Sequence, residues 1–121
     1  MSMKKTVVLG ATTNPERYAY LATTRLRRYG HEVIPVGLRT GRIGDVDILE
    51  GTPAVENVDT VTLYMRAERQ RPLYDYIFSL QPKRIIFNPG TENPELTALA
   101  EERGIETVEG CTLVMLSIGA Y

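Results

Sequence analysis

The chain has 121 residues, of which 43% are hydrophobic and 24% charged, and its formal net charge is -1. This length fits one domain spanning residues 1–121, and this charge balance gives no general attraction to nucleic acid. The apolar runs are too short to span a bilayer, no charged-then-apolar leader opens the sequence, and the single cysteine cannot form an internal disulfide. We therefore expect a cytoplasmic single-domain protein with neither a membrane nor a nucleic-acid partner.

The most informative segment is the loop that follows the first apolar run, which ends at Gly10. Asn14 and Pro15 supply the cap and the first position of a helix. Backbone N–H groups in such a strand-to-helix turn, together with the positive end of the helix macrodipole, suit an anion, and Thr12 and Thr13 add donors. The loop has one glycine where a dinucleotide fingerprint has three, so a phosphate cradle and a plain βα turn both fit it.

The helix is expected to run from this cap to Gly30, where a left-handed residue can end it. Its predicted buried face consists of Tyr18, Ala22, Leu26 and Tyr29. The arginines on its other faces are typical of a solvated surface, except that Arg17 lies beside the loop and could reach a ligand.

Four further segments are predicted strands because they are rich in β-branched and apolar residues. They are 31–36, 60–65, 84–88 and 105–108. Between the second and third strands, residues 37–44 read as a glycine-punctuated loop in which Arg39 and Arg42 are candidate phosphate ligands. Residues 45–59 have a weak pattern that fits a short strand or irregular structure better than a full helix.

The later helices carry clearer signals. Leu73, Tyr76, Ile77 and Leu80 fall on one helical face, although Pro72 obscures where that helix begins. The order Asn93-Pro94-Glu95 repeats the cap, proline and acid order of the first helix, and Cys111 to Ile118 reads as a short final helix.

Strands separated by helices predict an α/β fold with a mostly parallel sheet covered on both faces. In such a fold the ligand binds at the carboxyl ends of the strands. Four segments follow strands at that edge: Gly10 to Arg17, Gly37 to Arg42, Tyr64 to Arg66 and Asn88 to Asn93. This convergence is stronger than any single motif.

Four segments, taken in order, resemble those of the small stand-alone CoA-binding domain proteins. They are Val8 to Pro15, Ile34 to Val36, Ile86 to Gly90 and Gly110 to Met115. The resemblance covers nearly the whole chain, and these proteins are similar to the CoA-binding domain of the succinyl-CoA synthetase alpha subunit. It implies a Rossmann-like three-layer domain with a five-stranded, mostly parallel sheet that binds coenzyme A or an acyl-CoA.

The resemblance also implies which residues contact the coenzyme. The first loop, which would hold the pyrophosphate, is Gly10, Ala11, Thr12, Thr13 and Asn14, followed by Arg17 and Tyr18. The second-strand group is Val36, Gly37 and Arg39, with Arg39 near the CoA phosphates. The residues along the adenosine or pantetheine side are Tyr64, Met65 and Arg66, and those near the pantetheine arm are Asn88, Pro89 and Gly90. Many relatives have Asn-Pro where this chain has Gly37-Leu38, which leaves the path of that loop open.

Two other functions remain open at this stage. An NAD site would place an acidic residue at the end of the second strand to hold the ribose hydroxyls, and Val36 to Arg39 offers none. Arg39 could instead meet the 2′-phosphate of NADP, so an NADP-dependent oxidoreductase is one alternative. The other is an interaction module with a vestigial pocket that recruits an acyl-CoA enzyme.

The sequence assembles no catalytic set, and we assign neither a catalytic residue nor a metal ligand. The only histidine, His31, falls at the amino end of the second strand, where a surface or strand-entry role is expected. Cys111 follows the fifth strand, so it could be a small buried side chain or a thiol that faces the thiol of CoA. The oligomeric state is not indicated.

Overall fold

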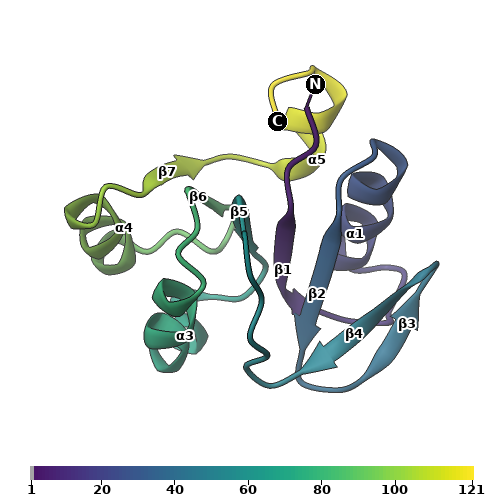
Figure 1. Ribbon diagram of the computed structural model, residues 1–121, viewed down its shortest axis with the longest axis horizontal. Helices are drawn as coiled ribbons and strands as arrows, with labels where there is room; N and C mark the ends of the chain where they lie inside the picture. Colours follow the sequence, from purple (N-terminus) through teal and green to yellow (C-terminus); the bar gives the residue numbers. More distant parts are fainter. Residues whose placement is uncertain (1) are drawn as a thin grey trace.

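The computed structural model describes residues 2–121, which form one open sheet with helices on both faces (Figure 1). The strands are β1 (Thr6–Ala11), β2 (Val33–Gly37), β3 (Gly41–Ile43), β4 (Val46–Glu50), β5 (Thr60–Leu63), β6 (Arg84–Phe87) and β7 (Glu106–Glu109). The helices are α1 (Tyr18–Arg28), α2 (Ala67–Gln70), α3 (Tyr74–Ser79), α4 (Pro94–Glu102) and α5 (Thr112–Ser117), with the 3-10 turn η1 (Arg71–Leu73) joining α2 to α3.

The order of strands across the sheet is β3-β4-β2-β1-β5-β6-β7. β3 pairs antiparallel with β4, and the other strand pairs are parallel. The predicted α/β, Rossmann-like class is confirmed. The predicted count of five strands is wrong, because residues 2–121 form a sheet of seven.

The two additional strands form a hairpin at the edge of the sheet. Ile43 pairs with Val46, so Gly44 and Asp45 make a two-residue turn, with Gly44 at φ 58°. A Gly-Asp pair between strands is a recognised hairpin signal, so the prediction that residues 37–44 are a loop is wrong for residues 41–43, which form β3. The carboxylate of Asp45 accepts hydrogen bonds from Arg27 Nε and Nη2 at 3.1 and 2.6 Å, which fastens the hairpin to α1.

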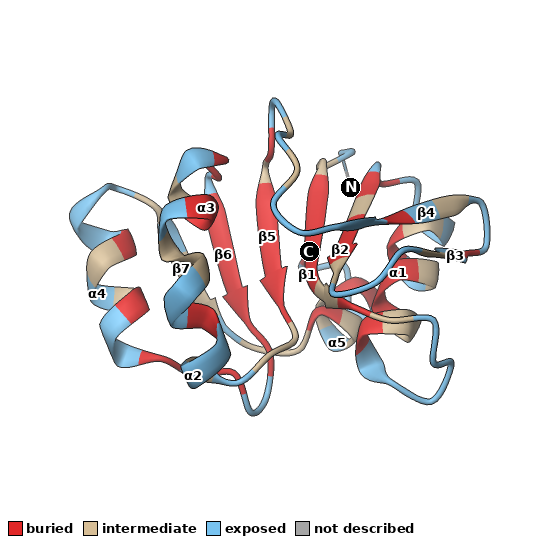
Figure 2. Cartoon of the chain, turned by 90° about the horizontal axis from the view of Figure 1, so that it is seen from below, coloured by how far each residue is buried: buried red, intermediate tan, exposed pale blue. Residues whose placement is uncertain are grey.

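The core has two parts, one on each face of the sheet. Alternate residues of β1 divide between them, since Val7 and Leu9 pack toward α3 and α4 while Val8 packs toward α1 and α5. Figure 1 shows α3 and α4 to one side of β1 and α1 to the other. In Figure 2 the central strands are buried along most of their length and the outward sides of the helices are exposed.

The first helix begins later than the sequence predicts. Asn14 Oδ1 accepts the backbone N–H of Glu16 at 3.0 Å, and Asn14 O accepts that of Arg17 at 3.1 Å, so these residues form a tight turn. Arg17 remains extended at ψ 145°, and α1 starts at Tyr18. Asn14 is therefore not the helix cap.

The predicted buried face of α1 is partly wrong. Ala22 and Leu26 are buried, but Tyr18 and Tyr29 are 70% and 44% exposed. Ala19 and Thr23 lie on the sheet-facing side instead, together with Ala22 and Leu26.

The later helices match their predictions more closely. Asn93 caps α4 by accepting the Leu96 N–H at 3.1 Å, and Pro94 occupies the first position. Pro72 lies in η1, the 3-10 turn that separates α2 from α3, and the helical segment resumes directly after this turn. Within residues 2–121, none of the helices combines the length and apolar content needed to cross a lipid bilayer.

Candidate functional site

The candidate site lies at the edge of the sheet where the parallel strands end. Four connections meet there, after β1, β2, β5 and β6, because parallel strands carry their carboxyl ends to one side. The expected convergence of the four predicted loops is thus a property of the fold. In Figure 2 the arrowheads of β1, β5 and β6 point toward this edge, where α2 also lies.

Glycine allows the strand ends to approach closely at this edge. Gly10 has φ 101°, and a Cβ there would lie 2.9 Å from the carbonyl oxygen of Tyr64. A Cβ on Gly37 would collide with the carbonyl oxygen of Ala11, and one on Gly41 would lie 2.5 Å from Thr13 Cγ2. Side chains at these glycines would force apart the loops that frame the edge.

The loop after β1 presents unpaired backbone donors. The N–H groups of Thr12 and Thr13 meet no acceptor among residues 2–121. The first turn of α1 also has no side-chain cap, since its N-cap residue Arg17 makes no capping hydrogen bond. Free N–H groups and an open helix N-terminus at one place are the chemical requirements of an anion site.

The side chains of this loop are engaged locally. Thr12 Oγ1 accepts the N–H of Asn14 at 3.2 Å, and Asn14 Oδ1 accepts that of Glu16. Thr13, Asn14, Arg17 and Tyr18 are exposed, whereas Ala11 is buried. The loop is therefore held in shape by its own polar side chains, while the N–H groups of Thr12 and Thr13 stay free within residues 2–121.

Guanidinium groups flank the loop. Arg17, Arg39 and Arg66 are exposed, and the ion pairs found within residues 2–121 involve none of the three. Arg42 differs, because its Nε donates to Gly44 O at 3.2 Å and its Nη1 lies 3.6 Å from Asp47. Three of these four arginines are thus uncommitted.

Several predicted site residues have buried side chains. Val36 is 1% exposed and belongs to the core, so its side chain does not reach the edge. Asn88 is 2% exposed, and its amide nitrogen donates to Thr62 Oγ1 and Leu63 O while its oxygen accepts the Thr112 N–H. The Asn88 amide joins β5, β6 and α5, and Pro89 and Gly90 beyond it are exposed.

Tyr64 is turned toward the protein interior. Its ring packs against the part of the core beneath α1 and α5, and its buried hydroxyl has no hydrogen-bond partner among residues 2–121. Burial raises the pKa of the Tyr64 phenol well above its ordinary value. Met65 is half-buried and packs against the opposite part of the core.

A buried amide that the sequence analysis missed joins two of the loops. Gln70 is fully buried, and its Nε2 donates to Met65 O at 2.8 Å and to Thr91 O at 2.7 Å. Its Oε1 accepts from Asn93 Nδ2 at 2.9 Å, and that nitrogen also donates to the Tyr74 hydroxyl at 2.8 Å. Gln70 precedes Leu73 and Ile77 by three and seven residues, which was the available sequence signal for a polar residue on a buried helical face.

The opposite edge of the sheet carries a second polar cluster. His31 lies just before β2, as expected for a strand-entry residue, but it is fully buried and not on the surface. Its Nδ1 accepts the Lys4 backbone N–H at 2.9 Å, and its ring packs on that of Tyr121 with centroids 4.9 Å apart. Burial, followed by the charges of Lys4 and Arg84, lowers the pKa of His31.

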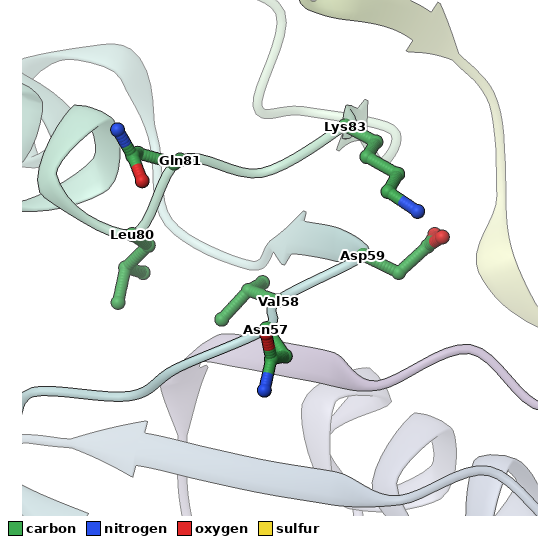
Figure 3. A pocket seen from close by; sticks show the side chains of 6 residues that line it. All are labelled: Asn57, Val58, Asp59, Leu80, Gln81 and Lys83. Atoms are coloured by element: carbon green, nitrogen blue, oxygen red, sulfur yellow. The ribbon is translucent and has the colours of Figure 1, made fainter.

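A shallow hollow of about 280 Å³ lies at this opposite edge (Figure 3). It is bounded by the turn before β5 and the turn before β6, and Lys83 and Asp59 point toward one another across it. Because these residues precede their strands, the hollow lies away from the convergent loops. It is not part of the candidate site.

Comparison with known proteins agrees with this arrangement. Residues 4–117 match the family model described as a CoA binding domain. The chain belongs to the CoA-binding domain family. No curated protein matches it.

Solved structures show how widely this CoA-binding domain fold is shared. A crystal structure of an uncharacterized protein is 55% identical, with a TM-score of 0.97 and full coverage of both chains. A hypothetical protein from Pyrococcus horikoshii OT3 is 22% identical, with a TM-score of 0.84 over 96% of this chain and 83% of that one. A Thermus thermophilus structure is also 22% identical, with a TM-score of 0.82 over 98% and 91% of the two chains. The last two establish the shared fold alone.

Proposed function

We propose that this CoA-binding domain holds coenzyme A or an acyl-CoA noncovalently at the convergent edge. The loop from Gly10 to Asn14 binds the pyrophosphate through backbone N–H groups, and Arg17 and Arg39 neutralise the phosphates. The connections after β5 and β6 run beside the pantetheine arm. No reaction is included in the proposal.

The observation that carries the proposal is the open start of α1. In α4 the cap residue Asn93 accepts the Leu96 N–H, whereas Arg17 leaves the first turn of α1 without a side-chain acceptor. The neighbouring N–H groups of Thr12 and Thr13 are also unengaged within residues 2–121. A phosphate oxygen would supply the missing acceptors, and the helix dipole would favour its charge.

The distribution of charged and uncharged residues along the edge indicates which end of the ligand lies near β2 and which lies near β6. Arg17 and Arg39 lie on the side of β1 and β2, which suits the phosphates of the nucleotide half. On the side of β5 and β6 the edge offers half-buried Met65 and exposed Pro89 and Gly90, which suit an uncharged arm, and Arg66 places one exposed guanidinium at the end of β5. We therefore place the adenosine near β2 and the thiol end beyond β6.

The remaining reactive groups support binding without catalysis. His31 is at the other edge, with Nδ1 already accepting a hydrogen bond. Cys111 is half-buried at the start of α5. Acyl transfer requires at least a base and a nucleophile in contact, whereas His31 and Cys111 lie at opposite ends of the sheet.

The proposal is tested by isothermal titration calorimetry with CoA, dephospho-CoA and NADPH. We expect CoA to bind tightly, dephospho-CoA more weakly because it lacks the 3′-phosphate, and NADPH weakly or not at all. Tight NADPH binding would favour an oxidoreductase. No heat with any of the three would leave an interaction module with a vestigial pocket.

A further inference from the structure

A pocket of about 400 Å³ lies between α2 and the start of α4, on the α3 and α4 side of the sheet. One wall begins at Ala67, directly after Met65 and Arg66, and the other at Pro94, directly after the β6 connection. The pocket therefore continues the two connections that the proposed function places beside the pantetheine arm. A ligand arm leaving the edge between them would enter this space next.

The floor of the pocket is fixed by hydrogen bonds. Asn93 lines it, and its amide nitrogen donates to Gln70 Oε1 at 2.9 Å and to the Tyr74 hydroxyl at 2.8 Å. Gln70 is fully buried and binds the carbonyl oxygens of Met65 and Thr91, so the two walls cannot separate without breaking these bonds. The pocket is a built feature of the fold rather than a gap between mobile side chains.

The charges that line the pocket favour one class of occupant. Arg71 Nη2 lies 3.0 and 3.3 Å from the two carboxylate oxygens of Glu95, and the Tyr74 hydroxyl donates to the same carboxylate at 2.9 Å. Glu68 adds a second carboxylate, and it forms no ion pair within residues 2–121. Two carboxylates against one guanidinium that is already paired give a net negative lining, which opposes a terminal carboxylate on the ligand.

We infer that the pocket between α2 and α4 receives the acyl group of an acyl-CoA and selects uncharged acyl groups over those that end in a carboxylate. Ala67 and Pro94 supply its apolar surface, and the net charge supplies the discrimination. This inference rests on the proposed function and deepens it by naming the class of acyl group.

The test compares 3′,5′-ADP, butyryl-CoA and succinyl-CoA by calorimetry on the whole protein and on three variants. Ala67→Trp fills the pocket, and Ala120→Trp adds the same side chain at an exposed position shortly after α5, which packs on the opposite face of the sheet. Glu95→Gln removes one carboxylate and releases Arg71. Thermal melts confirm that each variant is folded before it is titrated.

For the unmodified protein we expect butyryl-CoA to bind at least fivefold more tightly than succinyl-CoA. Ala67→Trp should weaken butyryl-CoA tenfold or more and leave 3′,5′-ADP unchanged, while Ala120→Trp should change neither. Glu95→Gln should bring succinyl-CoA to within twofold of butyryl-CoA.

Two results would overturn the inference in distinguishable ways. If 3′,5′-ADP binds but Ala67→Trp leaves butyryl-CoA unchanged, or succinyl-CoA equals butyryl-CoA in the unmodified protein, the acyl group lies elsewhere and the proposed function survives. If neither 3′,5′-ADP nor either thioester binds the unmodified protein, the proposed function fails and the acyl pocket fails with it.

Discussion

Replacing Gln70 with leucine tests whether this one amide holds the two loops of the candidate site together. The side chain is fully buried and makes three hydrogen bonds, to Met65 O, Thr91 O and Asn93 Nδ2, at 2.8, 2.7 and 2.9 Å. Gln70→Leu keeps the approximate volume but leaves both carbonyl oxygens without this donor. At about 1–2 kcal/mol for each unsatisfied buried group, the free energy of unfolding should fall by about 2–4 kcal/mol.

Urea unfolding at pH 7 measures this change, and Gln81→Leu is the matched control because Gln81 is exposed. A domain of ordinary stability, about 5–15 kcal/mol, would remain folded after such a loss. A Gln70→Leu variant within 0.5 kcal/mol of the unmodified protein would show that the three hydrogen bonds do not hold the loops, and the reasoning would be refuted.

The pH dependence of the stability of Gln70→Glu provides a second test of the same hydrogen bonds. A carboxylate in place of the amide would point lone pairs at two carbonyl oxygens, so the charged form is disfavoured and its pKa in the folded state should rise above the ordinary 4.3 or so. The folded variant then binds more protons than the unfolded chain, and its stability falls as pH rises. We expect Gln70→Glu to be less stable than Gln70→Leu at pH 7 and to approach it near pH 4.5.

Three further predictions concern single positions. Gly10→Ala should lower the free energy of unfolding by more than about 1–2 kcal/mol in urea unfolding, because φ 101° is strained for alanine and the new Cβ would meet Tyr64 O at 2.9 Å; an unchanged midpoint would contradict this. Folding lowers the pKa of His31, so the free energy of unfolding is highest above the pKa of the unfolded chain, near 6.5, and declines as the pH falls below that value. His31→Gln should flatten this decline between pH 6.5 and 5 in urea unfolding. If the two proteins lose stability in parallel over this range, His31 is not the group responsible. Arg39→Ala should weaken CoA binding by about 1.5–3 kcal/mol in calorimetry, because a charge-assisted hydrogen bond to phosphate is lost. Arg28→Ala, on the exposed side of α1, is the control and should leave CoA binding unchanged. If the two variants bind CoA equally well, Arg39 is an ordinary surface residue.

The fold was largely predictable because its main signals are local. Alternating apolar strands and helices imply a parallel sheet, and a parallel sheet brings the connections after β1, β2, β5 and β6 to one edge whatever their details. The β3–β4 hairpin was missed although Gly44-Asp45 signals it, because three-residue β3 is too short to show alternation. Its stability comes from tertiary contacts, including Arg27 with Asp45.

The site was less predictable because side-chain orientation depends on distant partners. Asn88 lies in the loop that the sequence places near the pantetheine arm, and its amide is bonded to Thr62 and Thr112, which are 26 and 24 residues away. Gln70 was overlooked because its partners, Met65, Thr91 and Asn93, lie in three separate connections. Sequence spacing locates such residues on an element but does not reveal what they bind.

The two Asn-Pro-Glu segments show how far local sequence determines structure. Asn93 is 4% exposed, and its amide nitrogen is held by Gln70 and Tyr74, so its oxygen is positioned to cap α4. Asn14 is exposed and has no such support, and its oxygen instead closes a short turn onto Glu16. Identical local signals therefore give a closed helix start in one case and an open one in the other.

This difference also divides the candidate site by charge. The uncapped start of α1 offers unpaired N–H groups and the positive end of a dipole, so it is the better of the two ends for phosphate. At α4 the Asn93 cap already satisfies the Leu96 N–H, and Glu95 adds negative charge in the first turn, so this helix start binds an anion less favourably than the start of α1. A ligand with phosphates at one end and an uncharged group at the other can satisfy both helix starts at once, whereas a ligand charged at both ends cannot.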